Sequence, residues 1–216
     1  MRRREGAMNI LIIILLFTSL LLTRVSRLKT AVSIILVQSF MVALACGIEG
    51  MEAGEVHMYI AAILTAVIKV GLIPYALLNI TEKWQQEREG HPILNVNFSS
   101  IAACITIVLA YSLIDQALPG AAGSRDALAT AVAMTLIGLL LIMTRRQAIM
   151  QIVGLITMEN GIYLVGLSAT KGLPLIIEMG IFFDVLVAVV VLVILTHRLK
   201  LSGMSTDISR LKKLKG

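Results

Sequence analysis

The sequence predicts an all-α, polytopic integral membrane protein with about seven transmembrane helices. Of its 216 residues, 58% are hydrophobic and only 15% are charged, which lies outside the range of ordinary soluble domains. The apolar runs are about 17 to 24 residues long, and a helix that rises about 1.5 Å per residue needs about 20 of them to cross the hydrocarbon. The runs also lack the period-two alternation of a membrane barrel, so helices are expected.

Polar turns separate the apolar runs, and each run defines one expected span. In chain order the spans cover residues 8–23, 30–48, 57–80, 98–118, 127–143, 147–168 and 175–196. The third span carries Lys69 at its centre and Pro74 beyond it. Because proline removes a backbone donor and clashes with the carbonyl four residues earlier, a bend is expected beside the lysine. The fifth span is short, at about 17 residues, so little tilt is expected for it.

The spans group into two membrane halves and a tail. Residues 1–97 form an N-terminal half of three helices and a cytoplasmic loop, residues 98–196 form a C-terminal half of four helices, and residues 197–216 form a basic cytoplasmic tail. The first span ends at Arg24 rather than at a small-residue cleavage site, so it is not expected to be a cleaved signal peptide. Asp115 lies close enough to the end of the fourth span to reach headgroups or water.

Lys and Arg residues in the loops predict the orientation of the chain. An odd number of spans places the two termini on opposite sides of the membrane. One side receives thirteen Lys and Arg residues and the other receives five, not counting the one inside a span. Since the more basic side faces the cytoplasm, the C-terminus is expected in the cytoplasm and the N-terminus outside, across the cytoplasmic (inner) membrane.

Composition and spacing exclude several functional classes. The net charge of +6 does not indicate a nucleic-acid partner, because no aromatic side chains are interleaved with the basic ones. Cys46 and Cys104 sit in apolar runs without a CxxC partner, and the three histidines show no ligand spacing, so neither a disulfide nor a metal or haem site is expected. The chain also lacks a flavin motif, a phosphate loop and a nucleophile beside a base. No active site is therefore expected in it.

Three charged side chains lie deep inside the expected spans. An ionised group at membrane depth costs roughly 2.5 to 3.5 kcal/mol on insertion scales, so its presence requires a reason. Counted from the outer turn, Glu159 and Asp184 both lie roughly 14 Å below the surface, and Lys69 lies roughly 18 Å below it. Two acids and one base at similar depth predict a buried network that relays protons or ions.

Simpler interpretations of these residues stay open. The two acids can be structural anchors that pair with neighbouring helices, and the lysine can snorkel toward the surface. Glu178 lies one turn into the last span and points about 240° away from Asp184, so it is interpreted as lining an outer vestibule or contacting a partner subunit. Asn160, Gly161 and Gln38 are interpreted as residues of polar, close-packed helix contacts.

The second half of the chain contains a distinctive set of motifs. They are Arg145-Arg146-Gln147, Gly154-Leu155, Met158-Glu159-Asn160-Gly161, Glu178-Met179-Gly180-Ile181, Asp184 and Leu214-Lys215-Gly216. Together they resemble the membrane subunit called hydrogenase-4 component E. From about residue 127 the chain is also similar to subunit K of respiratory complex I and to the C subunit of Mrp-type antiporters.

The resemblance implies a place in the membrane arm of a group 4 nickel–iron hydrogenase or formate hydrogenlyase complex. Its partners would be antiporter-like membrane subunits and soluble hydrogenase subunits, and the nickel–iron centre and iron–sulfur clusters would lie in those partners. In the subunit K pattern, the essential glutamate directly follows a Gly-Leu pair. Here the carboxylate is Glu159, one helical turn closer to the outside, and Asp184 loosely matches the second membrane acid of that family.

Two interpretations of the function follow. In the first, the chain is a non-catalytic subunit of an oxidoreductase complex, and Glu159, Asp184 and Lys69 contribute to a buried proton or ion path. In the alternative, it is a purely structural scaffold of such a complex or of an Mrp-like antiporter, with no ion path of its own. A stand-alone transporter is disfavoured, because neither an aromatic cage nor an inverted pair of broken helices is evident.

Overall fold

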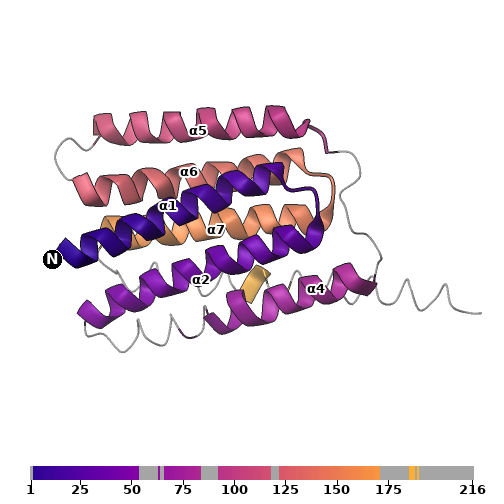
Figure 1. Cartoon of the computed structure of the whole chain (residues 1–216), viewed down its shortest axis with the longest axis horizontal. Coiled ribbons are helices and arrows are strands. Elements are labelled where there is room, and N and C mark those ends of the chain that lie inside the picture. Colours follow the sequence, from indigo (N-terminus) through magenta and orange to yellow (C-terminus); the bar gives the residue numbers. More distant parts are fainter. Residues whose placement is uncertain are drawn as a thin grey trace, which may run out of the picture.

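The computed structural model describes residues 2–53, 63, 66–83, 92–117, 122–170, 185–187 and 189. These residues contain helices and no strand, which confirms the all-α prediction. The elements are α1 (Arg2–Arg24), α2 (Leu28–Ala53), the π-helical segment η1 (Ala66–Leu72), α4 (Ile73–Lys83), α5 (Val96–Ala117), α6 (Ala122–Thr144) and α7 (Ala148–Thr170). Their axes are roughly aligned in one bundle, with α5 along one edge and α4 along the other (Figure 1).

Four of the described helices are long and apolar enough to cross a membrane. They contain the segments Leu28–Ile48, Val96–Ala117, Arg125–Thr144 and Ala148–Ser168. Two shorter apolar helices, Asn9–Arg24 and Ala66–Asn79, correspond to the first and third expected spans. The seventh expected span, 175–196, lies outside the described residues apart from 185–187 and 189. The protein is therefore a helical membrane protein, and the number of seven spans stays a prediction.

Two expected boundaries were wrong because apolar residues alone were counted. Helix α6 has 23 residues instead of about 17, since it begins at Ala122 and includes a polar first turn. Its apolar segment of 20 residues, Arg125–Thr144, reaches the usual length of a span, which removes the reason for expecting little tilt. The loop expected between 81 and 97 is also shorter, because α4 continues to Lys83 and α5 begins at Val96.

The third span departs from a regular α-helix at the place where proline predicted a bend. Residues Ala66–Leu72 form a π-helical turn just before Pro74. Proline has no N–H to donate to the carbonyl of Val70, and a π-turn is one way in which a helix absorbs such a break. Lys69 lies in this turn and is 1% exposed.

Among the helices that the structure describes, α6 and α7 share the most extensive contact, and glycines lie at it. A Cβ atom added at Gly138 of α6 would overlap the backbone nitrogen of Met158 on α7 and lie 2.7 Å from the carbonyl oxygen of Gly154. A Cβ atom at Gly161 of α7 would lie 2.6 Å from the backbone nitrogen of Thr135. Small residues therefore let the two backbones approach, as is common between membrane helices.

Replacing Gly138 with alanine is expected to destabilise the protein by about 1–3 kcal/mol, because the added methyl group meets backbone that has no room to move. Gly47→Ala is the matched control, since a Cβ atom at Gly47 of α2 has no neighbour within 4 Å. Thermal denaturation of the detergent-purified protein measures both changes. If Gly138→Ala melts at the same temperature as Gly47→Ala, the α6–α7 contact is looser than the structure indicates.

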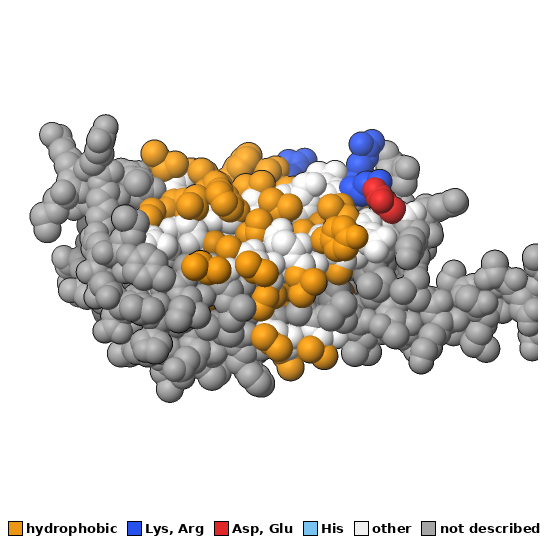
Figure 2. All heavy atoms as spheres, turned by 90° about the horizontal axis from the view of Figure 1, so that it is seen from below, with side chains coloured by type: hydrophobic (Ala, Val, Ile, Leu, Met, Phe, Trp, Pro, Cys, Tyr) orange, Lys and Arg blue, Asp and Glu red, His pale blue; other side chains and the backbone are white. Residues whose placement is uncertain are grey.

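The bundle has a central helix and a peripheral one. In the apolar segment of α7, 67% of the residues are buried, whereas in that of α5 only 17% are. The outward face of α5 exposes large aliphatic side chains, including Ile101, Ile105 and Val108. Another face of the molecule shows hydrophobic side chains along its described part and charged ones at one end (Figure 2). This distribution is that of a bundle with its sides in lipid and its ends at the membrane surfaces.

Candidate functional site

Two oppositely charged side chains meet inside the bundle. The Nζ atom of Lys69, on η1, lies 3.3 Å from Oε1 of Glu159, on α7. Their side chains are 0% and 4% exposed, so neither is solvated at the surface of the bundle. The wide turn before Pro74 carries the lysine to this position. The depth count placed these two residues at a similar level, and the structure brings them into contact.

Two further side chains of α7 lie beside the Lys69 ammonium. It donates a hydrogen bond to Oδ1 of Asn160 at 3.2 Å, and it lies 5.4 Å from the centre of the Tyr163 ring. Both contacts come from α7, as does Glu159, so one face of that helix supplies all three of these contacts. Moving two ions out of water costs several kcal/mol each, and a buried pair needs such additional polar contacts to offset that cost.

A row of hydrogen bonds continues from Asn160 across two more helices. Its Nδ2 atom donates to Oε1 of Gln38 and to Oγ of Ser39, both on α2, at 3.3 Å each. The Nε2 atom of Gln38 then donates to Oγ of Ser19 on α1 at 2.8 Å and reaches Oγ1 of Thr18 at 3.5 Å. We call these five residues the polar row. All five are buried, and together they join α7, α2 and α1.

The polar row and the ion pair form a layer between two apolar clusters. The first cluster includes Leu22, Ile35, Ile137 and Ile156. The second includes Leu15, Val42, Met134 and Tyr163. Along α1, α2 and α7 the polar residues come between a member of one cluster and a member of the other, so apolar packing closes both sides of the layer. Gln38 is ten residues from either end of the apolar segment Leu28–Ile48, which places the layer about 15 Å from both ends.

The remaining predicted site residues are placed as follows. Gly161 lies against Thr135 in the α6–α7 contact and not in the polar layer. Asp184 and Glu178 lie outside the described residues, so their expected roles stay predictions. Among the residues that the structure describes, no group of three or more His, Cys, Asp or Glu side chains is placed to hold a metal ion.

Arg145 has a structural role that the sequence did not predict. It was expected in a basic cytoplasmic loop, as part of the motif Arg145-Arg146-Gln147, yet it is 1% exposed. Its Nη2 atom donates to the carbonyl oxygens of Thr23 at 2.6 Å and Leu22 at 3.3 Å, in the last turn of α1. The final carbonyls of a helix lack partners within it, so this guanidinium caps α1. The neighbouring Arg146 is exposed, and nothing in the sequence distinguishes the two arginines.

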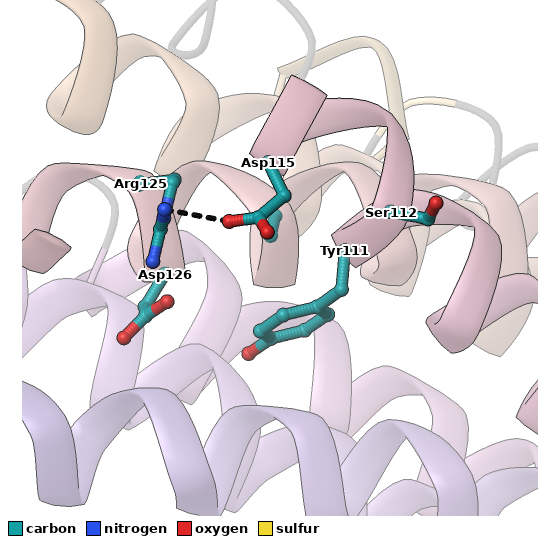
Figure 3. Close-up of a pocket in the computed structure, with 6 residues that line it drawn as sticks. Tyr111, Ser112, Asp115, Arg125 and Asp126 are labelled. Carbon is teal, nitrogen blue, oxygen red and sulfur yellow. Dashed lines mark ion pairs between the residues drawn. The ribbon is translucent and has the colours of Figure 1, made fainter. Parts of the chain in front are cut away.

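A shallow pocket of about 230 Å³ lies between the end of α5 and the start of α6. Arg125 and Asp115 form an ion pair of 2.6 Å across it, with Tyr111 and Asp126 also in its lining (Figure 3). The Asp115 side chain is 63% exposed, as expected for an acid near a span end. Pairs this exposed contribute at most about 1 kcal/mol, so this pocket differs in kind from the buried layer.

Comparison with known proteins gives two groups of relatives. Over 157 residues, 72% of this chain and 71% of the relative, the chain is 34% identical to hydrogenase-4 component E of Escherichia coli K12, and it matches the protein of that name from Shigella flexneri equally well. Over 163 residues, 69% of this chain and 73% of the relative, it is 30% identical to an uncharacterised protein of Mycobacterium tuberculosis. No protein-family model and no solved structure matches the chain.

Proposed function

The chain belongs to the hydrogenase-4 component E family, and we propose that it is a membrane-arm subunit of a hydrogenase-4-type complex. We further propose that Lys69 and Glu159 form part of a proton path in that complex. The observation that carries the proposal is the ion pair of 3.3 Å in the middle of an apolar bundle. Ionisable groups at membrane depth are costly and are typical of proton relays and ion pathways.

The pair can couple proton movement to charge. A proton that reaches Glu159 neutralises the carboxylate and removes a negative charge that lies 3.3 Å from the Lys69 ammonium, in a layer bounded by apolar clusters. Loss of a neighbouring opposite charge is costly in such a layer, so a proton that arrives at the carboxylate changes the electrostatic surroundings of the ammonium. A charge that appears or moves nearby in the complex would therefore shift protons between them. Asp184 is included in the proposal as a second carboxylate, on the basis of its expected depth.

Family membership supports the wider setting of the proposal. The complex would lie in the cytoplasmic membrane, with the N-terminus of this chain outside and its C-terminus in the cytoplasm. Antiporter-like membrane subunits and soluble hydrogenase subunits would be its partners, and those soluble subunits would hold the nickel–iron centre and the iron–sulfur clusters. Formate would be one source of electrons in a complex of the formate hydrogenlyase type.

The double variant Lys69→Met/Glu159→Gln tests the proposed path. It removes one charge of each sign, so the net charge of the layer is unchanged. In membrane vesicles that contain the assembled complex, we expect hydrogen-linked proton movement to fall by roughly tenfold or more, because both exchangeable groups are lost. A fluorescent pH indicator measures the movement, and hydrogen turnover in the presence of an uncoupler shows that the complex still works.

Asp115→Asn is the matched control, because it removes a carboxylate that lies at the surface of the bundle. Proton movement is expected to stay at the wild-type level in this variant. If the double variant also assembles and moves protons at the wild-type rate, the proposed path is wrong.

The alternative function, a structural scaffold, is favoured by one specific observation. The same buried polar groups connect α1, α2, η1 and α7. A scaffold subunit would use such contacts to hold its helices together. In that case the double variant would reduce the amount of assembled complex. Each complex that did assemble would show normal coupling of hydrogen turnover to proton movement.

A further inference from the structure

Within the polar row, every side-chain hydrogen bond is donated in the direction away from Lys69. The charge of Lys69 explains this common direction. An ammonium has three donors and no acceptor. The amide of Asn160 must therefore turn its oxygen toward Lys69, which it does at 3.2 Å. Its nitrogen is then left to donate away from the charge, and it meets Oε1 of Gln38 and Oγ of Ser39.

The same constraint passes to the next residues. Because Oε1 of Gln38 accepts from Asn160, its Nε2 atom faces α1 and donates to Ser19 at 2.8 Å. The hydroxyl of Ser19 in turn donates to the backbone carbonyl of Leu15 at 2.8 Å, a group that can only accept. The row is thus fixed at both ends, by a group that only donates and a group that only accepts, and each amide has a single orientation.

This orientation is also the one that stabilises positive charge on Lys69. The amides of Asn160 and Gln38 both point their oxygen toward the ammonium and their nitrogen away from it. Asn160, Gln38 and Ser19 are each 0% exposed, so water does not weaken these dipoles. In such a layer, hydrogen bonds in series reinforce one another.

We propose that Asn160 and Gln38 are positioning residues, which hold the Lys69 ammonium against Glu159 through a row of hydrogen bonds anchored on Ser19 of α1. The consequence for transport rests on the proposed function, whereas the positioning itself does not. Through this row, α1 and α2 help to set the geometry of an ion pair to which they contribute no charge.

A double-mutant cycle on the purified complex tests the positioning without any measurement of transport. Gln38→Met keeps the length of the side chain and removes its amide. In the wild-type background we expect it to lower the Tm by roughly 2–4 °C for each of the two hydrogen bonds lost, one from Asn160 and one to Ser19. In the Lys69→Met/Glu159→Gln background we expect at most about half of that shift, because the row no longer orients a charge.

Thr157→Val is the matched control for the cycle. Thr157 is also 0% exposed, but its hydroxyl donates to the carbonyl of Val153 within its own helix. Its Tm shift should be the same in both backgrounds. If Gln38→Met does not fold, Ser19→Ala at the far end of the row takes its place, with a smaller shift and the same dependence on background.

The outcomes separate this inference from the proposed function. Equal Tm shifts for the row variant in both backgrounds would overturn the positioning role, whatever the transport assay shows. A background-dependent shift together with a severalfold slower hydrogen-linked proton movement in Gln38→Met supports both. A background-dependent shift with proton movement unaffected even in Lys69→Met/Glu159→Gln supports the positioning and rejects the proton path.

Discussion

Replacing Glu159 alone with glutamine is expected to destabilise the protein more than replacing Glu159 and Lys69 together. The single change keeps the shape of the side chain but removes the negative charge that lies 3.3 Å from the buried Lys69 ammonium. Breaking a buried ion pair at one partner costs about 3–5 kcal/mol, whereas replacing both partners by uncharged groups of similar size is often close to neutral. In thermal denaturation of the detergent-purified complex, Glu159→Gln should therefore have a lower Tm than Lys69→Met/Glu159→Gln.

The exposed ion pair between Lys29 and Glu82 supplies the control for this comparison. Its atoms are 3.2 Å apart, close to the distance of the buried pair, but its side chains are 56% and 65% exposed. Glu82→Gln should cost less than about 1 kcal/mol, because water screens and solvates the remaining charge. If Glu159→Gln is as mild as Glu82→Gln, the Lys69 charge is solvated and the buried layer is not closed to water.

Replacing Arg145 with methionine is expected to cost about 3–5 kcal/mol, while the same change at Arg146 should have little effect. The Arg145 guanidinium is buried and donates to two carbonyl oxygens at the end of α1, so its loss leaves polar groups without their partner inside the bundle. It also holds the end of α6 against the end of α1. Arg146 is exposed and keeps its charge in water or headgroups.

The substitution Arg145→Lys separates the effect of the charge from that of the guanidinium shape. Arg145→Lys keeps the charge but replaces the planar fork with a single ammonium, so we expect it to recover only part of the lost stability. The yield of complex that stays monodisperse in detergent after heating measures all three variants. Equal losses for Arg145→Met and Arg146→Met would show that the loop charge matters and that the cap on α1 does not.

The sequence by itself determined the fold class and the approximate position of the described spans, although not every boundary. A helix in lipid must satisfy its backbone hydrogen bonds internally, so the length and apolarity of a segment are enough to identify it. Residue counting along such helices also placed Lys69 and Glu159 at similar depth, because the rise per residue is constant. Pro74 likewise predicted an irregular helix beside Lys69, because a proline has no backbone N–H to donate.

Only the tertiary structure decided which helix faces meet. The spans are apolar on nearly all sides, so periodicity does not show how each helix is rotated about its axis. That rotation joins Gln38 to Asn160 and thereby to the ion pair, and it turns Arg145 under the end of α1 while Arg146 stays exposed. Depth along the membrane is a property of each segment, whereas contact between helices depends on packing at glycines such as Gly138, which is a property of the whole bundle.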